Sequence, residues 1–301
     1  MSNPSSNNHI WISLTPVVFV LLWATGFIAT KYGLPYAEPM TFLVWRFGIV
    51  TAILLPASLI MRAPWPRTGK EAFHSMMTGI LIHGLYLGGV FWAIARGMPA
   101  GLSALIVGCQ PIVTAIFAGL LLDEKISPRQ WLGLLIGLAG LALVLGPRLP
   151  DGGLVWGDNI ALIFNVIALG GITFGTIYQK AFVSGTDLRT GGVFQYIGAL
   201  LVAMTGMLLF EEGRLEWTPQ MIGAMAWLVI ALSIGATTLL MLLIRRGAIS
   251  KVATLFYLVP AVTSLMAWFL FDETLAPLQL AGVGTIMFAV WLATSAAKSP
   301  A

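Results

Sequence analysis

The chain has 301 residues, of which 58% are hydrophobic and only 9% are charged. A soluble domain usually carries about a quarter charged residues, so this chain cannot cover its surface with hydrated groups, and its apolar surface must meet lipid. The single cysteine, Cys109, excludes an intramolecular disulfide and a cysteine-rich metal site.

Ten apolar runs follow one another along the chain. Residues 1–10 are polar and rich in Ser and Asn, and they lack the basic segment of a signal peptide, so we expect a disordered tail. A helix needs roughly 20 apolar residues to cross a bilayer core of about 30 Å. Scanning for such runs predicts helices over 11–31, 40–61, 73–95, 100–122, 128–146, 156–178, 190–210, 219–243, 250–271 and 276–297. No loop between them is long enough for a soluble domain, which excludes an attached ATPase or enzyme domain.

Basic residues are distributed unevenly among the loops. Loops after even-numbered spans, together with the C-terminus, hold eleven Lys and Arg, whereas loops after odd-numbered spans hold four. Cytoplasmic loops carry the excess of positive charge in membrane proteins. We therefore expect a multi-pass protein of the bacterial inner membrane with both termini, including the tail, in the cytoplasm.

An internal repeat relates the two halves of the chain. A shift of 149 residues superimposes spans 4 and 5 on spans 9 and 10 without a gap, so that Pro111, Asp123, Glu124 and Gln130 fall on Pro260, Asp272, Glu273 and Gln279. Each half, 11–146 and 156–297, then holds five helices, and an odd number gives the halves opposite orientations. The sequence predicts an all-α membrane protein of two inverted five-helix repeats, which is an architecture of many secondary transporters.

Two prolines interrupt helices at matched positions of the repeat. Pro111 and Pro260 lie near the middle of spans 4 and 9, where each removes the hydrogen bond to the carbonyl of Val107 or Phe256. One interpretation is a packing kink that neighbouring helices repair. The other is a hinge beside a substrate site, and the symmetric placement favours it.

Charged residues are nearly absent from the predicted spans. None of them contains Asp or Glu, and proton-coupled carriers commonly hold an intramembrane carboxylate. His83 is then the only intramembrane group that titrates near neutral pH. Facilitated transport, driven by the gradient of the solute, remains the other option. His83 has no second His or Cys to pair with, so we expect no metal site.

Arg46 lies about a third of the way into span 2, where an unpaired charge is costly. Three roles are open. Its long side chain can reach the membrane interface. It can bond to carbonyls at helix ends and stabilise one conformation, as a structural charge. It can also bind a carboxylate of the substrate.

Polar residues on the helices give the candidate binding site. Such groups often only join helices by hydrogen bonds. Beside His83 there is space, because Gly84, Gly88 and Gly89 follow it, and Tyr86 lies on the same helical face. From these positions we select His83, Tyr86, Gln110, Asn165 and Tyr257 as residues that contact a solute. No catalytic or cofactor motif is present, so we expect no enzyme and no cofactor.

A family resemblance rests on several of these residues. The segment from Trp23 to Lys31, then Pro39 and Arg46, and the two copies of the Pro…Asp-Glu…Gln pattern resemble EamA-type members of the drug/metabolite transporter superfamily, with the amino-acid exporter branch the most similar. Such members commonly have Gly-Glu where this chain has Asp123-Glu124.

The resemblance implies a monomer in membrane lipid that exports small metabolites, most often amino acids, by alternating access. We expect a small-molecule solute as partner and no nucleic acid. The carbonyls of Val107 and Phe256 with Gln110 and Asn165 would then meet the ammonium group of an amino acid, and His83, Tyr86 or Tyr257 its carboxylate. A proton-coupled exporter of drugs or other metabolites is the alternative, and a channel or a membrane scaffold is more distant.

Overall fold

The computed structural model describes residues 4–98, 100–146, 159–271 and 276–295 of the chain. Within these ranges ten helical spans are long and apolar enough to cross a membrane, and the ten predicted spans are thereby confirmed. Apart from one isolated bridge between Ala37 and Leu215, the same ranges contain only helices, turns and irregular segments.

The first half of the chain holds spans 1 to 5. Its helices are α1 (Pro4–Gly33), η1 (Leu34–Tyr36), α2 (Pro39–Ile60), α3 (Gly69–Gly79), η2 (Ile80–Leu85), α4 (Tyr86–Ala95), α5 (Ala100–Val107), α6 (Gln110–Leu121) and α7 (Pro128–Leu145). Span 3 consists of α3, η2 and α4, and span 4 consists of α5 and α6.

The second half holds spans 6 to 10. Its helices are α8 (Asn159–Tyr178), η4 (Gln179–Val183), α9 (Leu188–Phe210), α10 (Pro219–Trp227), η5 (Leu228–Ala236), α11 (Thr237–Arg246), α12 (Ile249–Thr254), η6 (Leu255–Tyr257), α13 (Leu258–Phe271) and α14 (Pro277–Thr294). Five spans in each half mean that the second half begins on the opposite side of the membrane from the first.

The start of the chain differs from the expected disordered tail. Residues 4–10 are helical and continuous with α1. Pro4 stands at the first position of this helix, where proline is tolerated, and no glycine or proline follows before Pro16. Extending an existing helix costs far less than nucleating one, so polar residues of modest propensity can continue α1.

Local sequence signals set where several spans begin. α2, α7, α10 and α14 each start at a proline, which lacks the N–H that the first turn leaves unpaired. Ser127 precedes α7 and forms a reciprocal cap with Gln130. These signals fix the helix starts that hydropathy alone leaves open by several residues.

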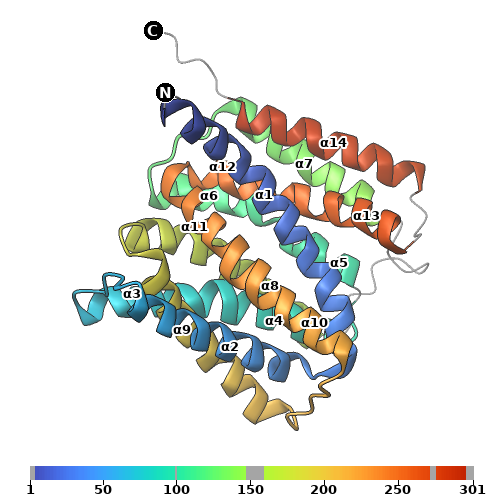
Figure 1. Ribbon diagram of the computed structural model, residues 1–301. Helices are drawn as coiled ribbons and strands as arrows, with labels where there is room; N and C mark the ends of the chain where they lie inside the picture. The colour runs from blue at the N-terminus through green and yellow to red at the C-terminus, as the bar shows by residue number, and fades with distance from the viewer. Residues whose placement is uncertain (1–3, 99, 147–158, 272–275, 296–301) are drawn as a thin grey trace.

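Equivalent spans of the two halves lie side by side. α7 contacts α14, α2 contacts α9, and α6 contacts α12. Figure 1 shows the first pair along one edge of the bundle and the second pair along the opposite edge. α1 contacts α13, α10 and η5, while α8 contacts α6, α4 and η2, so spans 1 and 6 also occupy corresponding places.

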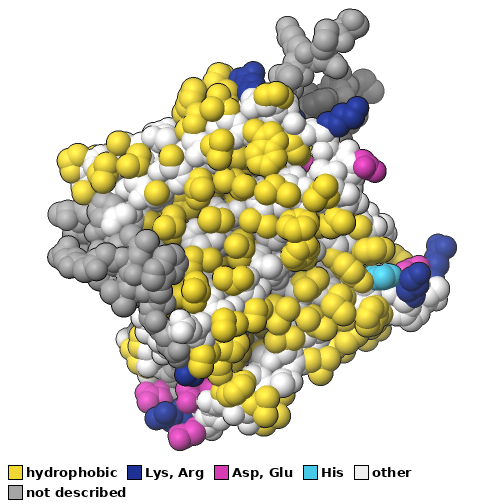
Figure 2. All heavy atoms as spheres, turned by 180° about the vertical axis from the view of Figure 1, so that it is seen from behind, with side chains coloured by type: hydrophobic (Ala, Val, Ile, Leu, Met, Phe, Trp, Pro, Cys, Tyr) yellow, Lys and Arg dark blue, Asp and Glu magenta, His cyan; other side chains and the backbone are white. Residues whose placement is uncertain are grey.

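Charge separates the two ends of the bundle. We call the end with Arg62, Lys125, Lys180, Arg189 and Arg245 the basic end, and the end with Glu38, Glu211, Glu212 and Glu216 the acidic end. Between them, large apolar side chains such as Leu120, Leu208, Ile230 and Phe269 are exposed. Figure 2 shows apolar side chains over the middle of one face, with charged side chains gathered toward its ends. This apolar belt is the surface that lipid covers.

Candidate functional site

Three of the described spans contain π-helical segments, and two of these spans stand at equivalent positions of the repeat. The first, η2, covers Ile80–Leu85 of span 3, and the second, η5, covers Leu228–Ala236 of span 8. The shift of 149 residues carries 80–85 onto 229–234, inside η5. π-Helical turns are rare and frequently found at functional sites. Both segments contribute side chains to the cavity described next.

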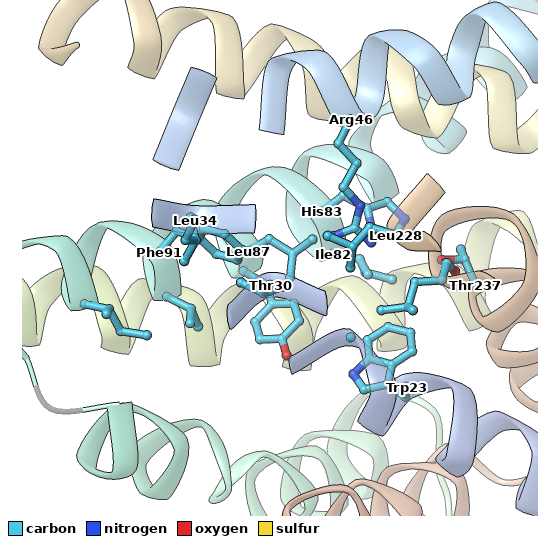
Figure 3. Close-up of a pocket in the computed structure, with 15 residues that line it drawn as sticks. Trp23, Thr30, Leu34, Arg46, Ile82, His83, Leu87, Phe91, Leu228 and Thr237 are labelled. Carbon is cyan, nitrogen blue, oxygen red and sulfur yellow. The ribbon is translucent and has the colours of Figure 1, made fainter. Parts of the chain in front are cut away.

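A cavity of about 100 Å³, here cavity A, lies between spans 1, 2, 3 and 8. Its polar lining includes Arg46, His83 and Thr237, which are labelled in Figure 3, together with Thr30 and Tyr86. From there it extends to Leu34, Phe91 and Ile94, which lie where α1 and α4 reach the acidic end. The remaining wall is largely apolar and includes Trp23, Leu87, Val90, Leu228 and Leu232. Cavity A is thus a mostly apolar chamber with one cationic end.

Arg46 lies inside the protein and not at the membrane interface. Its side chain is only 6% exposed, and its Nε donates to the Ser233 hydroxyl at 2.9 Å. Figure 3 shows it extending from α2 toward His83 and the cavity. None of the ion pairs among the described residues includes Arg46. The interpretation that it reaches the interface is therefore wrong, because the helices that surround α2 enclose this position.

His83 and Tyr86 both line cavity A. The imidazole of His83 is stacked on the Tyr196 ring, with centroids 4.9 Å apart and planes 18° apart. Its Nε2 is buried and has no hydrogen-bond partner among the described residues. Trp23 lies within side-chain hydrogen-bonding contact of Tyr86. Two of the five predicted solute contacts are therefore placed together in one cavity.

A second cavity of about 410 Å³, here cavity B, lies at the basic end between spans 2, 7 and 8. Its charged lining residues are Asp187, Arg189 and Arg245. Arg189 binds Asp187 at 2.9 Å and holds the pKa of that carboxyl below its usual range, so Asp187 stays ionised at neutral pH. Arg245 donates to the carbonyl of Thr186. Cavity B therefore carries an excess of positive charge.

A thin polar layer separates the two cavities. The hydroxyl of Tyr196 donates to the carbonyl of Ser233 and contacts the hydroxyl of Thr237 at 3.2 Å. Tyr196 and Ser233 line cavity B, Thr237 lines both cavities, and Arg46 binds Ser233 from cavity A. We call Arg46, Tyr196, Ser233 and Thr237 the polar layer. These four residues link spans 2, 7 and 8 by hydrogen bonds at the place where the two cavities share Thr237.

Three members of the polar layer were missed by sequence reasoning. Ser233 and Thr237 are four residues apart on span 8, so they share a helical face, and Tyr196 is a lone polar ring in span 7. The spacing of Ser233 and Thr237 could have predicted a polar face on span 8. Nothing in the sequence indicated that they face Arg46 and not another neighbour.

Gln110, Asn165 and Tyr257 lie outside both cavities. Gln110 donates to the Thr114 hydroxyl at 3.0 Å on its own helix, Asn165 donates to the sulfur of Met98, and Tyr257 donates to the Leu134 carbonyl at 3.1 Å. Periodicity shows which residues share a face of a helix, but not which neighbour that face meets. In this structure Tyr257 joins span 9 to span 5, Asn165 binds the connection between spans 3 and 4, and Gln110 bonds within its own helix.

The proline positions interrupt their spans as expected. Span 4 breaks between Val107, the end of α5, and Gln110, the start of α6, one residue before Pro111. Span 9 changes from α12 through the 3-10 turn η6 to α13, which contains Pro260. Neither Val107 nor Phe256 lines cavity A or B; the ring of Phe256 packs on Phe19 and Trp23. Whether the breaks are hinges stays a prediction.

The Asp123-Glu124 turn lies outside both cavities. Glu124 follows span 4 and binds the first amides of α12, Ile249 N at 2.7 Å and Ser250 N at 3.2 Å. Its repeat partner, the Asp272-Glu273 turn, lies outside the described residues. Among the residues that are described, no three His, Cys, Asp or Glu lie close enough to hold a metal ion.

Comparison with known proteins assigns both halves of the chain to one family. Residues 9–146 and 159–295 each match the model of the EamA-like transporter family. The inner membrane transporter YedA of Escherichia coli is 26% identical over 276 residues, covering 91% of this chain and 87% of that protein. The transporter YvbV of Bacillus subtilis is 25% identical over 290 residues, covering 93% and 90%.

Two further similarities bear on function and fold. A protein of Salmonella typhimurium named "Probable amino-acid metabolite efflux pump" is 25% identical over 290 residues, covering 92% of each chain. A solved structure, titled only as a crystal structure of a protein, superimposes with a TM-score of 0.73 at 20% identity over 94% of this chain and 96% of that one. The second similarity establishes the shared fold.

Proposed function

Because the chain belongs to the EamA-like transporter family, we propose that it exports small metabolites, amino acids first among them, across the inner membrane by alternating access. The family and the relatives are transporters and not enzymes, and one relative is named as an amino-acid metabolite efflux pump. Inner-membrane relatives and ten apolar spans agree on a multi-pass inner-membrane protein.

The observation that carries the proposal is the pair of cavities on either side of one polar layer. Cavity A extends toward the acidic end and cavity B lies at the basic end. A carrier needs one solute site that opens to each side in turn, and inverted repeats supply this by exchanging their conformations. A channel would need a continuous pore, and a scaffold has no use for paired cavities.

The charge of the two ends supports an orientation. The basic end carries the excess of Lys and Arg, so we place it and both termini in the cytoplasm. Cavity B is then the cytoplasmic vestibule and cavity A faces the outside. Residues 1–10 belong to the cytoplasmic side in this orientation.

Cavity A is the solute site in this proposal. His83 and Tyr86 contact the solute, with the aromatic and aliphatic wall around its side chain. Gln110, Asn165 and Tyr257 bond to other groups of the protein outside both cavities, so the proposal does not include them among the solute contacts. Pro111 and Pro260 act as hinges at which spans 4 and 9 bend when the cavities exchange access.

Energy coupling divides the proposal into two versions. Within the described spans the only carboxylate is Glu71, in the first turn of α3, which accepts from the backbone N–H of Arg67. A facilitator driven by the solute gradient therefore fits best. The alternative is a proton-coupled exporter of drugs or other metabolites, favoured by the apolar wall of cavity A, with His83 as the proton site.

The test is uptake of a labelled amino-acid panel into liposomes that hold the purified protein, with and without an imposed pH gradient. Saturable uptake that ignores the gradient supports the facilitator. Uptake that follows the gradient, and loses this dependence in His83→Ala, supports the alternative. If no amino acid enters faster than in empty liposomes, the amino-acid assignment is wrong.

Variants sharpen the placement of the solute. Tyr86→Ala is expected to lower uptake severalfold, whereas Gln110→Ala and Tyr257→Ala keep near wild-type uptake per folded protein. Loss of uptake in Gln110→Ala with an unchanged Tyr86→Ala would move the site away from cavity A.

A further inference from the structure

The positive charge of Arg46 has no counterion among the described residues. Only 6% of the residue is exposed, and among the described residues its one printed hydrogen-bond partner is the neutral hydroxyl of Ser233, which Nε reaches. A buried charge in the membrane is costly and is usually paired. Arg46 is therefore a buried cation without a counterion in the described part of the chain.

The residues around Arg46 do not provide the missing negative charge. No Asp or Glu of the described ranges lines cavity A, and its other polar residues are Trp23, Thr30, His83, Tyr86 and Thr237. Two glutamates of the acidic end, Glu38 and Glu211, bind the chain there: Glu38 accepts from Arg214 N, and Glu211 accepts from Met40 N and Thr41 N. Both are engaged outside cavity A.

Cavity B, like cavity A, has a net positive charge. Of its three charged residues, Asp187 and Arg189 neutralise each other, which leaves Arg245 as the net charge. A positively charged vestibule raises the local concentration of anions. A solute that enters from the basic end would meet Arg245 first and then Arg46 in the polar layer.

We propose that cavity A binds the carboxylate of an organic anion, with Arg46 as its charged anchor and the Ser233 and Thr237 hydroxyls beside it. The proposal rests on the proposed function and names the substrate class of that site. An arginine presents its N–H groups as a planar fork that fits a carboxylate, and the pair formed by both Nη nitrogens is the part of the fork that remains available.

The rest of the solute must suit an apolar chamber. Trp23, Leu87, Val90, Phe91 and Leu232 form the wall away from Arg46. An aliphatic or aromatic group loses little by contacting such a wall, whereas a second carboxylate would need a second Arg or Lys, which the described lining does not offer. The preferred solutes are monocarboxylates with an apolar remainder, and the carboxylate of an apolar amino acid is recognised in the same way.

Matched acids and amides test this directly. Binding of 3-phenylpropionate and 3-phenylpropionamide, and of 3-methylbutanoate and its amide, is measured by titration calorimetry on the purified protein in detergent. In each pair the two compounds have nearly the same shape and differ in charge. The wild type is expected to bind each acid at least ~10-fold more tightly than its amide, since hydrogen bonds to charged groups are the strong ones.

Three variants complete the experiment. Arg46→Gln is expected to remove the preference for the acid, and Arg46→Lys to keep the preference at lower acid affinity, because a point charge replaces the fork. Arg67→Gln changes an exposed arginine in the loop after α2 and should behave as the wild type. Each variant is first shown to elute as a single folded species in size-exclusion chromatography. If Arg46→Gln does not fold, the comparison with the wild type uses Arg46→Lys alone.

The outcomes separate the two proposals. No preference for acids in the wild type, an unchanged preference in Arg46→Gln, or no binding of either acid overturns the carboxylate site, whatever is transported. Acid binding that depends on Arg46 but without transport of any solute into liposomes upholds the site and contradicts the transporter proposal. Transport of neutral or cationic solutes that is unchanged in Arg46→Gln contradicts the carboxylate site and upholds the transporter proposal.

Discussion

At the scale of single residues, two glutamates each bind the start of a helix in the opposite half. Glu124 accepts from Ile249 N, Ser250 N and the Ser250 hydroxyl at 2.7–3.2 Å, and Glu211 accepts from Met40 N, Thr41 N and the Thr41 hydroxyl at 2.7–2.8 Å. The first amides of a helix have no partner inside the helix and lie at its positive end. One such cap lies at each end of the bundle.

The turn before Glu124 explains a departure from the family pattern. Asp123 has a φ of 54°, in the left-handed region that favours glycine and that Asp tolerates better than most residues. The family commonly places Gly-Glu here. Asp-Glu therefore preserves the turn that presents Glu124 to α12.

Removing one cap charge should destabilise the protein measurably. Glu124→Gln keeps the size of the side chain but loses the charge that binds Ile249 N and Ser250 N, at a cost of about 1–2 kcal/mol. The thermal midpoint of the purified protein in detergent is the measurement. Glu212→Gln is the control, because the Glu212 side chain is 77% exposed, and it should leave the midpoint unchanged. Equal midpoints for the two variants would contradict the cap.

Sequence reasoning predicted some residues of cavity A correctly and placed others there wrongly, for a physical reason. His83 and Tyr86 were found because an imidazole and a phenol beside several glycines are unusual in an apolar span. The sequence singled out Arg46 as an unusual charge but did not predict its surroundings. The cost of burying a charge depends on neighbouring helices, which hydropathy does not show. Gln110, Asn165 and Tyr257 looked equivalent to His83 in sequence and differ only in which helix they face.

At the scale of elements, the spans and their starts were predictable and their internal irregularities were not. Hydrophobic length gives a span, and a proline at the first turn gives its beginning, as at Pro39 and Pro128. The π-helical segments η2 and η5 leave no mark in hydropathy, because apolar residues fill them as they fill an α-helix. Their discovery needed the backbone.

Close contact between spans 3 and 7 depends on two glycines. A Cβ added to Gly79 would collide with the carbonyl oxygen of Gln195, and one added to Gly198 would collide with that of Met76. Each glycine thus lets its helix approach the backbone of the other, as small residues do between membrane helices.

Gly79→Ala and Gly198→Ala should therefore push spans 3 and 7 apart. Overpacking of this kind costs about 1–3 kcal/mol, and here the colliding atoms belong to the backbone and cannot turn aside. Yield of folded protein and thermal midpoint in detergent are the measurements. Gly48→Ala is the matched control, because no atom lies within 4 Å of its added Cβ. Two variants as stable as this control would show that the helices are further apart than described.

At the scale of the whole molecule, the repeat predicts the pairing of equivalent spans and the two opposed cavities. Five helices per half and matched prolines were visible in the sequence, and α7 with α14 and α2 with α9 are the pairs that an inverted duplication produces. Which end holds the larger cavity was not predictable. The difference in cavity volume depends on small differences in side-chain packing between the two repeats.

The caps at the two ends should bias the protein in opposite directions. In a Cys109→Ser background, Ile94→Cys reports on the mouth of cavity A and Thr238→Cys on cavity B. Glu211→Gln weakens the cap at the acidic end and should raise maleimide labelling at position 94 and lower it at 238. Glu124→Gln should have the opposite effect. Labelling rates that rise or fall together at both positions would mean that the caps affect only stability.

Counterflow tests the central claim, carriage by alternating access, most directly. Liposomes with the purified protein are loaded with an excess of unlabelled solute, the one taken up best in the panel, and diluted into a trace of the same solute with a label. A carrier that exchanges one site between two sides accumulates label inside transiently above its outside concentration, and we expect this accumulation. Label that only equilibrates, without passing the outside concentration, would indicate a channel and contradict the account.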